Sequence, residues 1–391
     1  MDVFLLSAVR TPIGKFLGGL SDLSAPQLGS VAIAEALKRA NVPADRIDEV
    51  IMGQVIQAGC GQNPARQAAL GAGFPTTINA HTTNMVCGSG LKAVMLAAQS
   101  IRCGDAEAIV AGGMESMSRT PFLLPNVRGG YKYGDQTTQD ALIRDGLWCS
   151  FEKWPMGNAA EHIATKCGVT RADQDRFSVQ SHQRAAKARS EGAFDRELVS
   201  VSVGSGSRAT VVAQDEGIRV DSTIEGLGKL KPAFNPTGTV TAGNASQLSD
   251  GAAAVVLASG KFVESQGVKP IAKVVSQATS GVDPRDIFIA PVMAVRKACT
   301  AAKLSIDEID LFELNEAFAA QMLACNGELK IDEAKINVHG GAIALGHPLG
   351  ASGARVLTTL VHALHRHGKR YGLASLCLGG GNAVAVVVER V

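Results

Sequence analysis

Apolar positions repeat with a helical spacing in two stretches that lie far apart along the chain. In each stretch they recur every three or four residues, the spacing of one buried face of a helix. The first stripe consists of Leu91, Val94, Met95, Ala98 and Ile101. The second consists of Val356, Leu357, Leu360, Val361 and Leu364. We therefore predict one helix over each stretch.

Short runs of apolar residues, several of them β-branched, follow both stripes. Residues 108–111 and 383–388 contain no polar side chain. Strands that are covered on both faces of a sheet have this composition, whereas half-exposed strands alternate between apolar and polar residues. Together with the helical stripes, these runs indicate the α/β class, with helices packed against the strands.

Short phrases of the sequence occur twice, in the same order and at a nearly constant separation. The matched pairs are Ile47–Val50 with Ile306–Ile309, Gly90 with Gly353, and 108–113 with 376–381. Matches of this length also arise by chance. Three pairs in the same order nevertheless favour a duplicated unit.

The segment between the two copies differs in composition from both. It holds the two tryptophans, Trp148 and Trp154, and a capping box at Thr170–Asp173 that predicts a helix toward Arg189. Insertions on a repeated core often carry a binding surface. The predicted units are residues 1–119 with 250–270, an inserted loop domain at 120–249, and residues 271–391.

Composition and charge exclude several classes of protein. The 391 residues carry 38 Lys and Arg against 36 Asp and Glu, so the basic surplus of a nucleic-acid binder is missing. The eight cysteines form no CxxC pair, which argues against a zinc site. No apolar run approaches the ~20 residues of a membrane span, and the N-terminus lacks a signal-peptide pattern. We expect a protein of the cytoplasm that does not bind nucleic acid or a membrane.

Cys87 is the first candidate catalytic residue. It lies in the segment Asn84–Gly90, directly before the first predicted helix. Backbone N–H groups and the helix dipole at that position favour a thiolate, which would act as a nucleophile. The neighbouring glycines would let a substrate carbonyl approach the backbone. The alternative is a small buried cysteine without a chemical role.

Three further segments carry candidate chemistry. His347 lies in a Gly- and Pro-rich turn, where it could be the base for a thiol or a turn histidine bonded to the backbone. Cys377 and Gly379 lie at the end of a strand, where free N–H groups can bind an oxyanion. Asn315 stands in an apolar stretch, either as a buried polar group that needs partners or as a helix cap.

These four segments together resemble the thiolase family, and more closely its acetyl-CoA acetyltransferase branch. The resemblance runs from Ser7–Pro12 to the last glycine-rich strand. The family motifs, all in order, are Val86–Gly90, Asn315–Phe318, Gly346–Pro348 and Cys377–Gly381. The resemblance implies a duplicated fold of two α/β/α/β/α halves with an inserted loop domain. It also implies no metal or bound cofactor, and a homodimer or homotetramer.

The resemblance implies a role for each reactive residue. Cys87 would take the acyl group from an acyl-CoA as a thioester, and His347 would activate that thiol. His347 and a water held by Asn315 would polarise a thioester carbonyl. Cys377 would move the proton at the α-carbon of the second substrate, and the N–H groups of Cys87 and Gly379 would form a second oxyanion hole. The implied reaction is a ping-pong Claisen condensation of two acetyl-CoA to acetoacetyl-CoA and CoA, with thiolysis as its reverse.

Coenzyme A would lie across the inserted loop domain. The residues at the positions where the family binds it are Leu147, Met156, Arg219, Phe234, Ala242, Ser246 and Phe318. Three positions depart from the family pattern: Pro155 replaces a histidine, Gly226 replaces a serine, and Ile287 replaces a methionine of the acyl pocket. A 3-ketoacyl-CoA thiolase of broader or longer chain range is therefore the alternative.

Two other function classes are weighed against this interpretation. A sister condensing enzyme, such as a ketoacyl synthase or hydroxymethylglutaryl-CoA synthase, would lack the second cysteine, so Cys377 argues against it. A non-catalytic CoA- or lipid-binding protein on the same scaffold would not need the full reactive set. That set is Cys87, His347, Asn315 and Cys377.

Overall fold

The framework of the fold is a ten-stranded mixed sheet. The structure is a computed structural model that describes residues 1–206 and 209–391. The strands of the first half, in spatial order, are β1 (Val3–Arg10), β12 (Ser249–Ser259), β5 (Ala108–Ser116), β3 (Glu49–Gly53) and β4 (Asn79–Thr83), with the short β2 (Gly14–Lys15) beside β12. Those of the second half are β13 (Ala272–Gly281), β16 (Asn382–Arg390), β15 (Tyr371–Leu378) and β14 (Leu311–Leu314).

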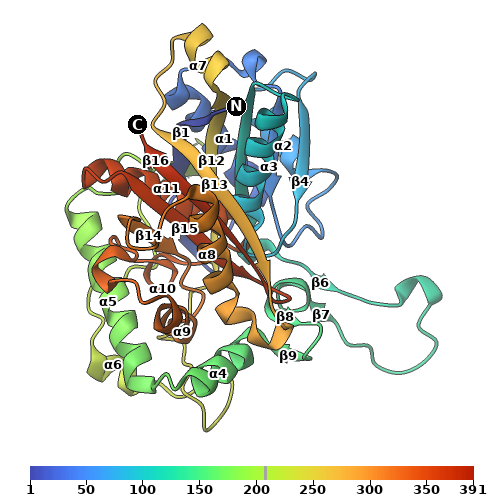
Figure 1. The fold of residues 1–391 in the computed structure, drawn as a ribbon. Helices are drawn as coiled ribbons and strands as arrows, with labels where there is room; N and C mark the ends of the chain where they lie inside the picture. The colour runs from blue at the N-terminus through green and yellow to red at the C-terminus, as the bar shows by residue number, and fades with distance from the viewer. Residues whose placement is uncertain (207–208) are drawn as a thin grey trace.

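The two halves of the sheet repeat the same pairing. β1 pairs antiparallel with β12, β12 pairs antiparallel with β5, and β5 pairs parallel with β3. β13, β16, β15 and β14 repeat this series in the same order and directions. The equivalent strands β1 and β13 pair with each other where the halves meet. The strand order therefore agrees with the duplication predicted from the repeated phrases, and Figure 1 shows the orange β13 beside the red strands of the second half.

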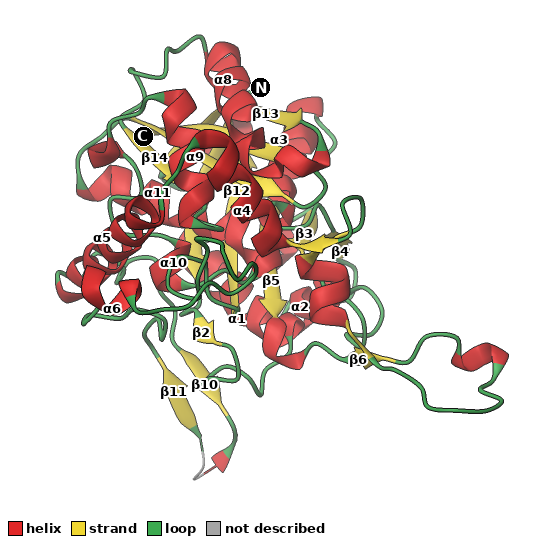
Figure 2. Cartoon of the chain, turned by 90° about the horizontal axis from the view of Figure 1, so that it is seen from below, coloured by secondary structure: helices red, strands yellow, loops and turns green. Residues whose placement is uncertain are grey.

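Helices form three layers around the strands (Figure 2). The predicted stripes lie on α3 (Ser89–Cys103) and α11 (Leu349–Arg366), which pack against each other between the two halves. The outer side of the first half is covered by α1 (Ala25–Ala40) and α2 (Pro64–Gly71), and that of the second by α8 (Ala290–Ala302) and α9 (Ala319–Leu329). Each layer has its own apolar core, which gives the α/β/α/β/α order expected from the family resemblance.

Glycine is required where the two central helices cross. A Cβ atom on Gly353 would lie 2.2 Å from the backbone nitrogen of Leu91, and one on Gly90 would lie 2.8 Å from that of Ala354. Real side chains do not tolerate such contacts, so backbone packs directly on backbone here. The repeated glycines of the sequence are therefore the contact between the two copies.

The inserted segment lies beside this core and supplies one wall of the site. Its elements are β6 (Phe122–Leu123), β7 (Gln139–Asp140), β8 (Trp148–Cys149), β9 (Trp154–Pro155), α4 (Met156–Cys167), α5 (Arg171–Ser190), β10 (Val201–Val203), β11 (Thr210–Val212) and α6 (Ile224–Gly228). The predicted helix is confirmed, and Thr170 is its N-cap, because its hydroxyl accepts from the N–H of Asp173 at the start of α5. The Asp173 carboxylate accepts from the Thr170 hydroxyl and not from its backbone N–H, so the cap is not the reciprocal capping box that the sequence predicts. Figures 1 and 2 show the residues between β6 and β7 as an arm that projects from the body. We retain the boundaries at 120 and 249 as a proposal.

Two further short α-helices lie in the core: α7 (Gly260–Gln266) follows β12, and α10 (Ala342–Leu345) precedes the histidine turn. Across residues 1–206 and 209–391, no helix is long and apolar enough to cross a membrane.

A buried arginine fastens the inserted segment to the core. Arg10, at the end of β1, is fully buried. Its Nε lies 2.6 Å from a carboxylate oxygen of Glu197, and its Nη1 and Nη2 lie 2.6 and 2.9 Å from the two oxygens of Asp215. The guanidinium also stacks 5.1 Å from the ring centroid of Phe194. One cation therefore pairs with two buried carboxylates from the inserted segment.

Replacing this arginine is expected to destabilise the fold strongly. Arg10→Ala leaves two buried carboxylates without their cation, and breaking a buried pair in this way costs about 3–5 kcal/mol. We expect a correspondingly lower midpoint of urea unfolding. Lys273→Ala removes an exposed partner of Asp2 and serves as the control, with the midpoint nearly unchanged. An unchanged midpoint in Arg10→Ala would contradict the proposed anchor.

Candidate active site

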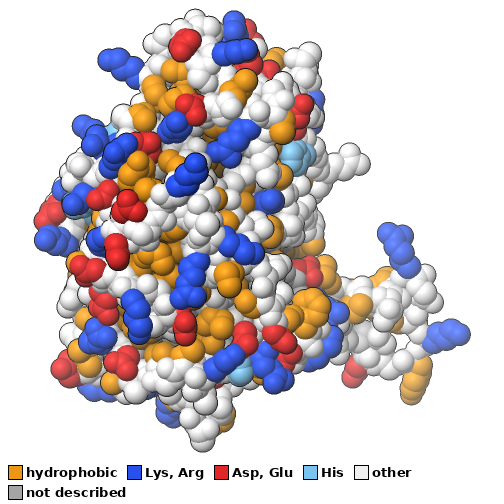
Figure 3. Space-filling view, in the orientation of Figure 1, with side chains coloured by type: hydrophobic (Ala, Val, Ile, Leu, Met, Phe, Trp, Pro, Cys, Tyr) orange, Lys and Arg blue, Asp and Glu red, His pale blue; other side chains and the backbone are white. Residues whose placement is uncertain are grey.

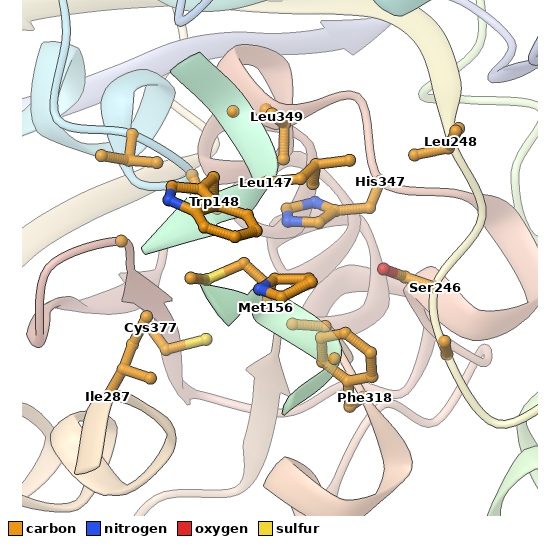
Figure 4. A pocket seen from close by; sticks show the side chains of 18 of the residues that line it. Leu147, Trp148, Met156, Ser246, Leu248, Ile287, Phe318, His347, Leu349 and Cys377 are labelled. Atoms are coloured by element: carbon orange, nitrogen blue, oxygen red, sulfur yellow. The ribbon is translucent and has the colours of Figure 1, made fainter. Parts of the chain in front are cut away.

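An apolar cavity of about 380 Å³ lies between the two halves and the inserted segment. The sequence-predicted residues Cys87, His347, Cys377 and Gly379 all line it. Most of the remaining wall is apolar. It includes Val86, Met117, Ile143, Leu147, Trp148, Met156, Phe234, Leu248, Ile287, Phe288, Phe318 and Leu349. Figure 4 shows the His347 ring and the Cys377 sulfur facing this cavity from different sides.

A strained backbone turn presents Cys87. Val86 has φ of 47°, an unfavourable conformation for a β-branched residue. The turn is held by Ser89, whose hydroxyl accepts from the N–H of Met85 and donates to the Val86 carbonyl at 2.9 and 2.6 Å. Asn84 Oδ1 accepts from the Val86 N–H at 2.9 Å. Because α3 begins at Ser89, Cys87 stands just before a helix N-terminus, as predicted.

The protonation state of Cys87 differs from the expectation. Burial raises the pKa of the Cys87 thiol to about 12, while the N–H groups of Cys87 and Gly379 lower it in part. The sequence predicts a lowered pKa from the helix N-terminus alone, and that prediction is wrong. The apolar cavity penalises the thiolate more than the N–H groups stabilise it. At neutral pH Cys87 is therefore a thiol that needs a base.

His347 is held as a neutral base. Its Nδ1 lies 2.6 Å from the hydroxyl of Ser352, one turn into α11. That hydroxyl donates its own proton to the Pro348 carbonyl at 2.9 Å, so it accepts from Nδ1–H. The Nε2 lone pair is then left as the acceptor in the site. Burial, with a contribution from Arg355, lowers the pKa of His347 to about 3, so the ring is uncharged at neutral pH.

Asn315 is part of the site and not a helix cap. It follows β14, and α9 begins only at Ala319. Its side-chain Nδ2 lies 3.5 Å from His347 Nε2, and its buried Oδ1 has no partner among the described residues. The neighbouring Glu316 instead bonds to Ser181 and Asn337, each within 3 Å, and supports the surrounding loops.

Cys377 and Gly379 lie at the end of β15, as predicted from the sequence. Burial raises the pKa of Cys377 well above its ordinary value, and Cys87 and Cys325 add to the rise. Both thiols line the cavity, and a charge on Cys87 opposes ionisation of Cys377. The backbone N–H of Gly379 acts on Cys87 and not on Cys377. Two thiols, a neutral imidazole and N–H donors thus converge on one cavity.

The structure brings together most, but not all, of the residues predicted to contact CoA. Leu147, Met156, Phe234, Ser246 and Phe318 line the cavity. Arg219 and Ala242 are exposed residues outside its lining. Of the three departures from the family pattern, Pro155 and Ile287 lie in the wall and Gly226 does not.

Sequence reasoning missed residues that act behind the cavity wall. Ser352, which fixes the His347 ring, lies five positions after it, beyond the family motif, so its place in the first turn of α11 is the signal that was available. Glu115, at the end of β5, accepts three backbone N–H groups beneath the site and has no local sequence signal. Within the described parts of the chain, no group of three or more His, Cys, Asp or Glu side chains is placed to hold a metal ion.

Comparisons with known proteins agree with this geometry. The model for the thiolase N-terminal domain matches residues 3–261, and that for the thiolase C-terminal domain matches 268–390. An acetyl-CoA acetyltransferase of Cupriavidus necator is 50% identical over 390 residues, covering 100% of this chain and 99% of the relative. One of Escherichia coli is 50% identical over 387 residues, covering 99% and 98%. The crystal structure of the Bacillus anthracis acetyl-CoA acetyltransferase has a TM-score of 0.98 and 41% identity, covering 100% and 99%.

Proposed function

We propose that this chain, which belongs to the thiolase family, is an acetyl-CoA C-acetyltransferase. It condenses two acetyl-CoA to acetoacetyl-CoA and free CoA, and it catalyses the reverse thiolysis. The convergence of Cys87, His347 and Cys377 on one apolar cavity carries this proposal. Such a site supplies a nucleophile, a base for it and a second proton-transfer group.

The first half-reaction transfers the acetyl group to Cys87. His347 Nε2 takes the thiol proton, and the sulfur attacks the thioester carbonyl of acetyl-CoA. The carbonyl oxygen gains negative charge, which a water held by Asn315 and the His347 side chain stabilise. The C–S bond to CoA then breaks, and the leaving sulfur receives the proton from His347. CoA departs and the acetyl group remains on Cys87 as a thioester.

The second half-reaction forms the carbon–carbon bond. Cys377 first gives its thiol proton to His347, which is neutral again after the first half-reaction. The Cys377 thiolate then removes a methyl proton from a second acetyl-CoA, and the resulting carbanion attacks the acetyl-Cys87 carbonyl. The N–H groups of Cys87 and Gly379 bind the oxygen of that tetrahedral intermediate. Cys87 leaves as a thiolate and takes up the proton held by His347, while Cys377 keeps the methyl proton. Both sulfurs therefore end the cycle as thiols, and His347 ends it as a neutral imidazole.

CoA enters the cavity from the side of the inserted segment. Met156, Phe234 and Ser246 lie on that side, and Phe318 packs at 6.3 Å from the Phe234 ring centroid at the reactive end. We assign Arg219 and Ala242, which are exposed, to the outer part of the CoA site. Arginine can pair there with a phosphate in a bidentate manner.

An oligomer and a cytoplasmic location belong to the same proposal. The projecting arm exposes apolar side chains, visible as orange atoms in Figure 3, and such surfaces commonly mark protein–protein contacts. They belong to Phe122, Leu124, Val127, Tyr131 and Tyr133. We propose that this arm contacts another copy in a dimer or tetramer. A cytoplasmic location suits a reaction that needs two reduced thiols.

The substrate range tests the proposed function. Phe318 packs edge-on at 5.3 Å from Phe288 and closes the reactive end of the cavity, so we expect short substrates to be preferred. The value of kcat/KM should be at least ~10-fold higher for acetoacetyl-CoA than for 3-ketoacyl-CoAs of roughly eight to ten carbons. Thiolysis kinetics across a length series measure this directly.

The departures Pro155 and Ile287 leave the alternative of a broader or longer-chain 3-ketoacyl-CoA thiolase. A higher kcat/KM for the longer substrates in the wild-type protein would establish that alternative. As a matched variant, Ile287→Ala shortens a side chain in the wall and so enlarges the cavity. It should raise kcat/KM for the longer substrates relative to that for acetoacetyl-CoA. No CoA-dependent thiolysis of any length would overturn both functions.

A further inference from the structure

A buried carboxylate lies beneath the active site, where the two halves of the fold meet. Glu115 is fully buried at the end of β5. One of its oxygens accepts from the N–H groups of Val55 and Gly350, both at 2.9 Å, and the other accepts from the N–H of Ile56 at 3.3 Å. All three donors are backbone groups, and none belongs to the strand that carries the carboxylate.

These three contacts join the two loops that carry the reactive residues. Gly350 lies in the first turn of α11, three residues after His347. Val55 leads to the other loop, because its carbonyl accepts from Asn84 Nδ2 at 3.1 Å, and Asn84 in turn holds the Val86 N–H. The carboxylate therefore connects the turn before Cys87 with the turn that contains His347.

The backbone around Glu115 packs closely, and its donors suit a carboxylate. A Cβ atom on Gly350 would lie 3.0 Å from the Glu115 carboxylate and 2.7 Å from the Cα of Gln54, so this position favours glycine. Three N–H donors need acceptors only, which an ionised carboxylate provides and an amide does not. The negative charge also faces the positive N-terminal end of α11.

We propose that Glu115 is a positioning residue that holds the Cys87 turn and the His347 turn at the separation required for proton transfer. We call the Glu115 carboxylate and its three N–H donors, on Val55, Ile56 and Gly350, the clamp. The effect of the clamp on catalysis rests on the proposed function, but the contacts themselves can be tested separately. Proton transfer requires heavy atoms within hydrogen-bond reach, so a small shift of either turn slows it. A misplacement of about 1 Å can cost ~100-fold in rate.

Ionisation of the buried Glu115 lowers the stability of the fold. A charged group that does not stabilise the fold is consistent with a functional role. Burial raises the pKa of Glu115 to about 7, and Asp250 adds to the rise, while the N–H groups of Val55, Gly350 and Ile56 lower it. Because this pKa lies above the unfolded value, ionisation disfavours folding as the pH rises through 7. An amide at this position would avoid that cost but would lose the three-way contact.

The test compares Glu115→Gln with the wild type at pH 8. We expect kcat for thiolysis of acetoacetyl-CoA to fall ~100-fold and KM to stay within about threefold, because the CoA contacts lie on other elements. Hydrogen exchange at the amides of Val55, Ile56 and Gly350 should become at least ~10-fold faster, which peptides covering 54–57 and 347–352 report.

Asp48→Asn is the matched control. Asp48 accepts from the N–H groups of Glu107 and Ala108 at 2.7 and 3.0 Å, at the opposite end of β5. Its replacement should speed exchange only near those two residues and leave kcat unchanged. Absence of thiolase activity in the wild-type protein would overturn the proposed function. The exchange data would still show whether Glu115 holds the amides of Val55, Ile56 and Gly350.

The proposal is overturned if Glu115→Gln keeps kcat within threefold of the wild type, or if its exchange is unchanged. Should this variant fail to fold, Glu115→Asp provides the same test, because it keeps the charge and withdraws the carboxylate by one methylene group. A folded Glu115→Asp with lower kcat and faster exchange at Gly350 supports the clamp. Loss of the fold in both variants would overturn it, since the carboxylate would then be a folding element.

Discussion

Cys377→Ala is expected to keep acetyl transfer from acetyl-CoA to Cys87 and to lose condensation and thiolysis. Acylation requires only Cys87, His347 and the groups that stabilise the oxyanion. Carbon–carbon bond formation also requires a base at the α-carbon, and removing a general base typically costs about 10²–10⁴-fold in rate. A burst of one CoA per site, without steady turnover, should therefore be measured in this variant.

Exchange of the acetyl-CoA methyl protons with solvent deuterium separates this role from a general loss of packing. The exchange should stop in Cys377→Ala. Cys325→Ala is a matched control, because Cys325 is a buried cysteine on α9 that acts on the pKa of Cys377 and does not line the cavity. Exchange at the wild-type rate in Cys377→Ala would identify another group as the base.

Cys87→Ala is expected to abolish both half-reactions. Without the sulfur no acetyl-enzyme forms, and removal of a covalent nucleophile can lower kcat on the order of 10⁶-fold. CoA release from acetyl-CoA and thiolysis of acetoacetyl-CoA should both fall to background. Cys299→Ala removes a buried cysteine on α8, remote from the cavity, and should retain both activities. Retained CoA release in Cys87→Ala would refute the assigned nucleophile.

Much of the framework is readable from the sequence because local and tertiary preferences agree there. The stripe on α3 is buried as its spacing predicts, and Thr170 is the N-cap of α5. The matched glycines Gly90 and Gly353 lie where the two copies touch. In each case one local pattern specifies the structure. These patterns are the helical periodicity, the N-cap residue and the absence of a side chain at glycine.

The supporting parts of the site depend on contacts between distant segments. Glu115 contacts Gly350, which lies in the other half of the fold, and no local pattern indicates that pairing. The raised pKa of Cys87 likewise follows from apolar walls contributed by separate elements, whereas the sequence shows only the nearby helix. The family resemblance places Arg219 at the CoA site, whereas in the structure it is exposed and does not line the cavity.

The most direct test of the central claim is to find which residue carries the acetyl group. The wild-type protein is incubated with acetyl-CoA labelled in the acetyl group, quenched with acid, digested and analysed by mass spectrometry. We expect one labelled acetyl group per chain, on Cys87, with release of one CoA. A label on any other residue, or CoA release without a labelled enzyme, would contradict the account.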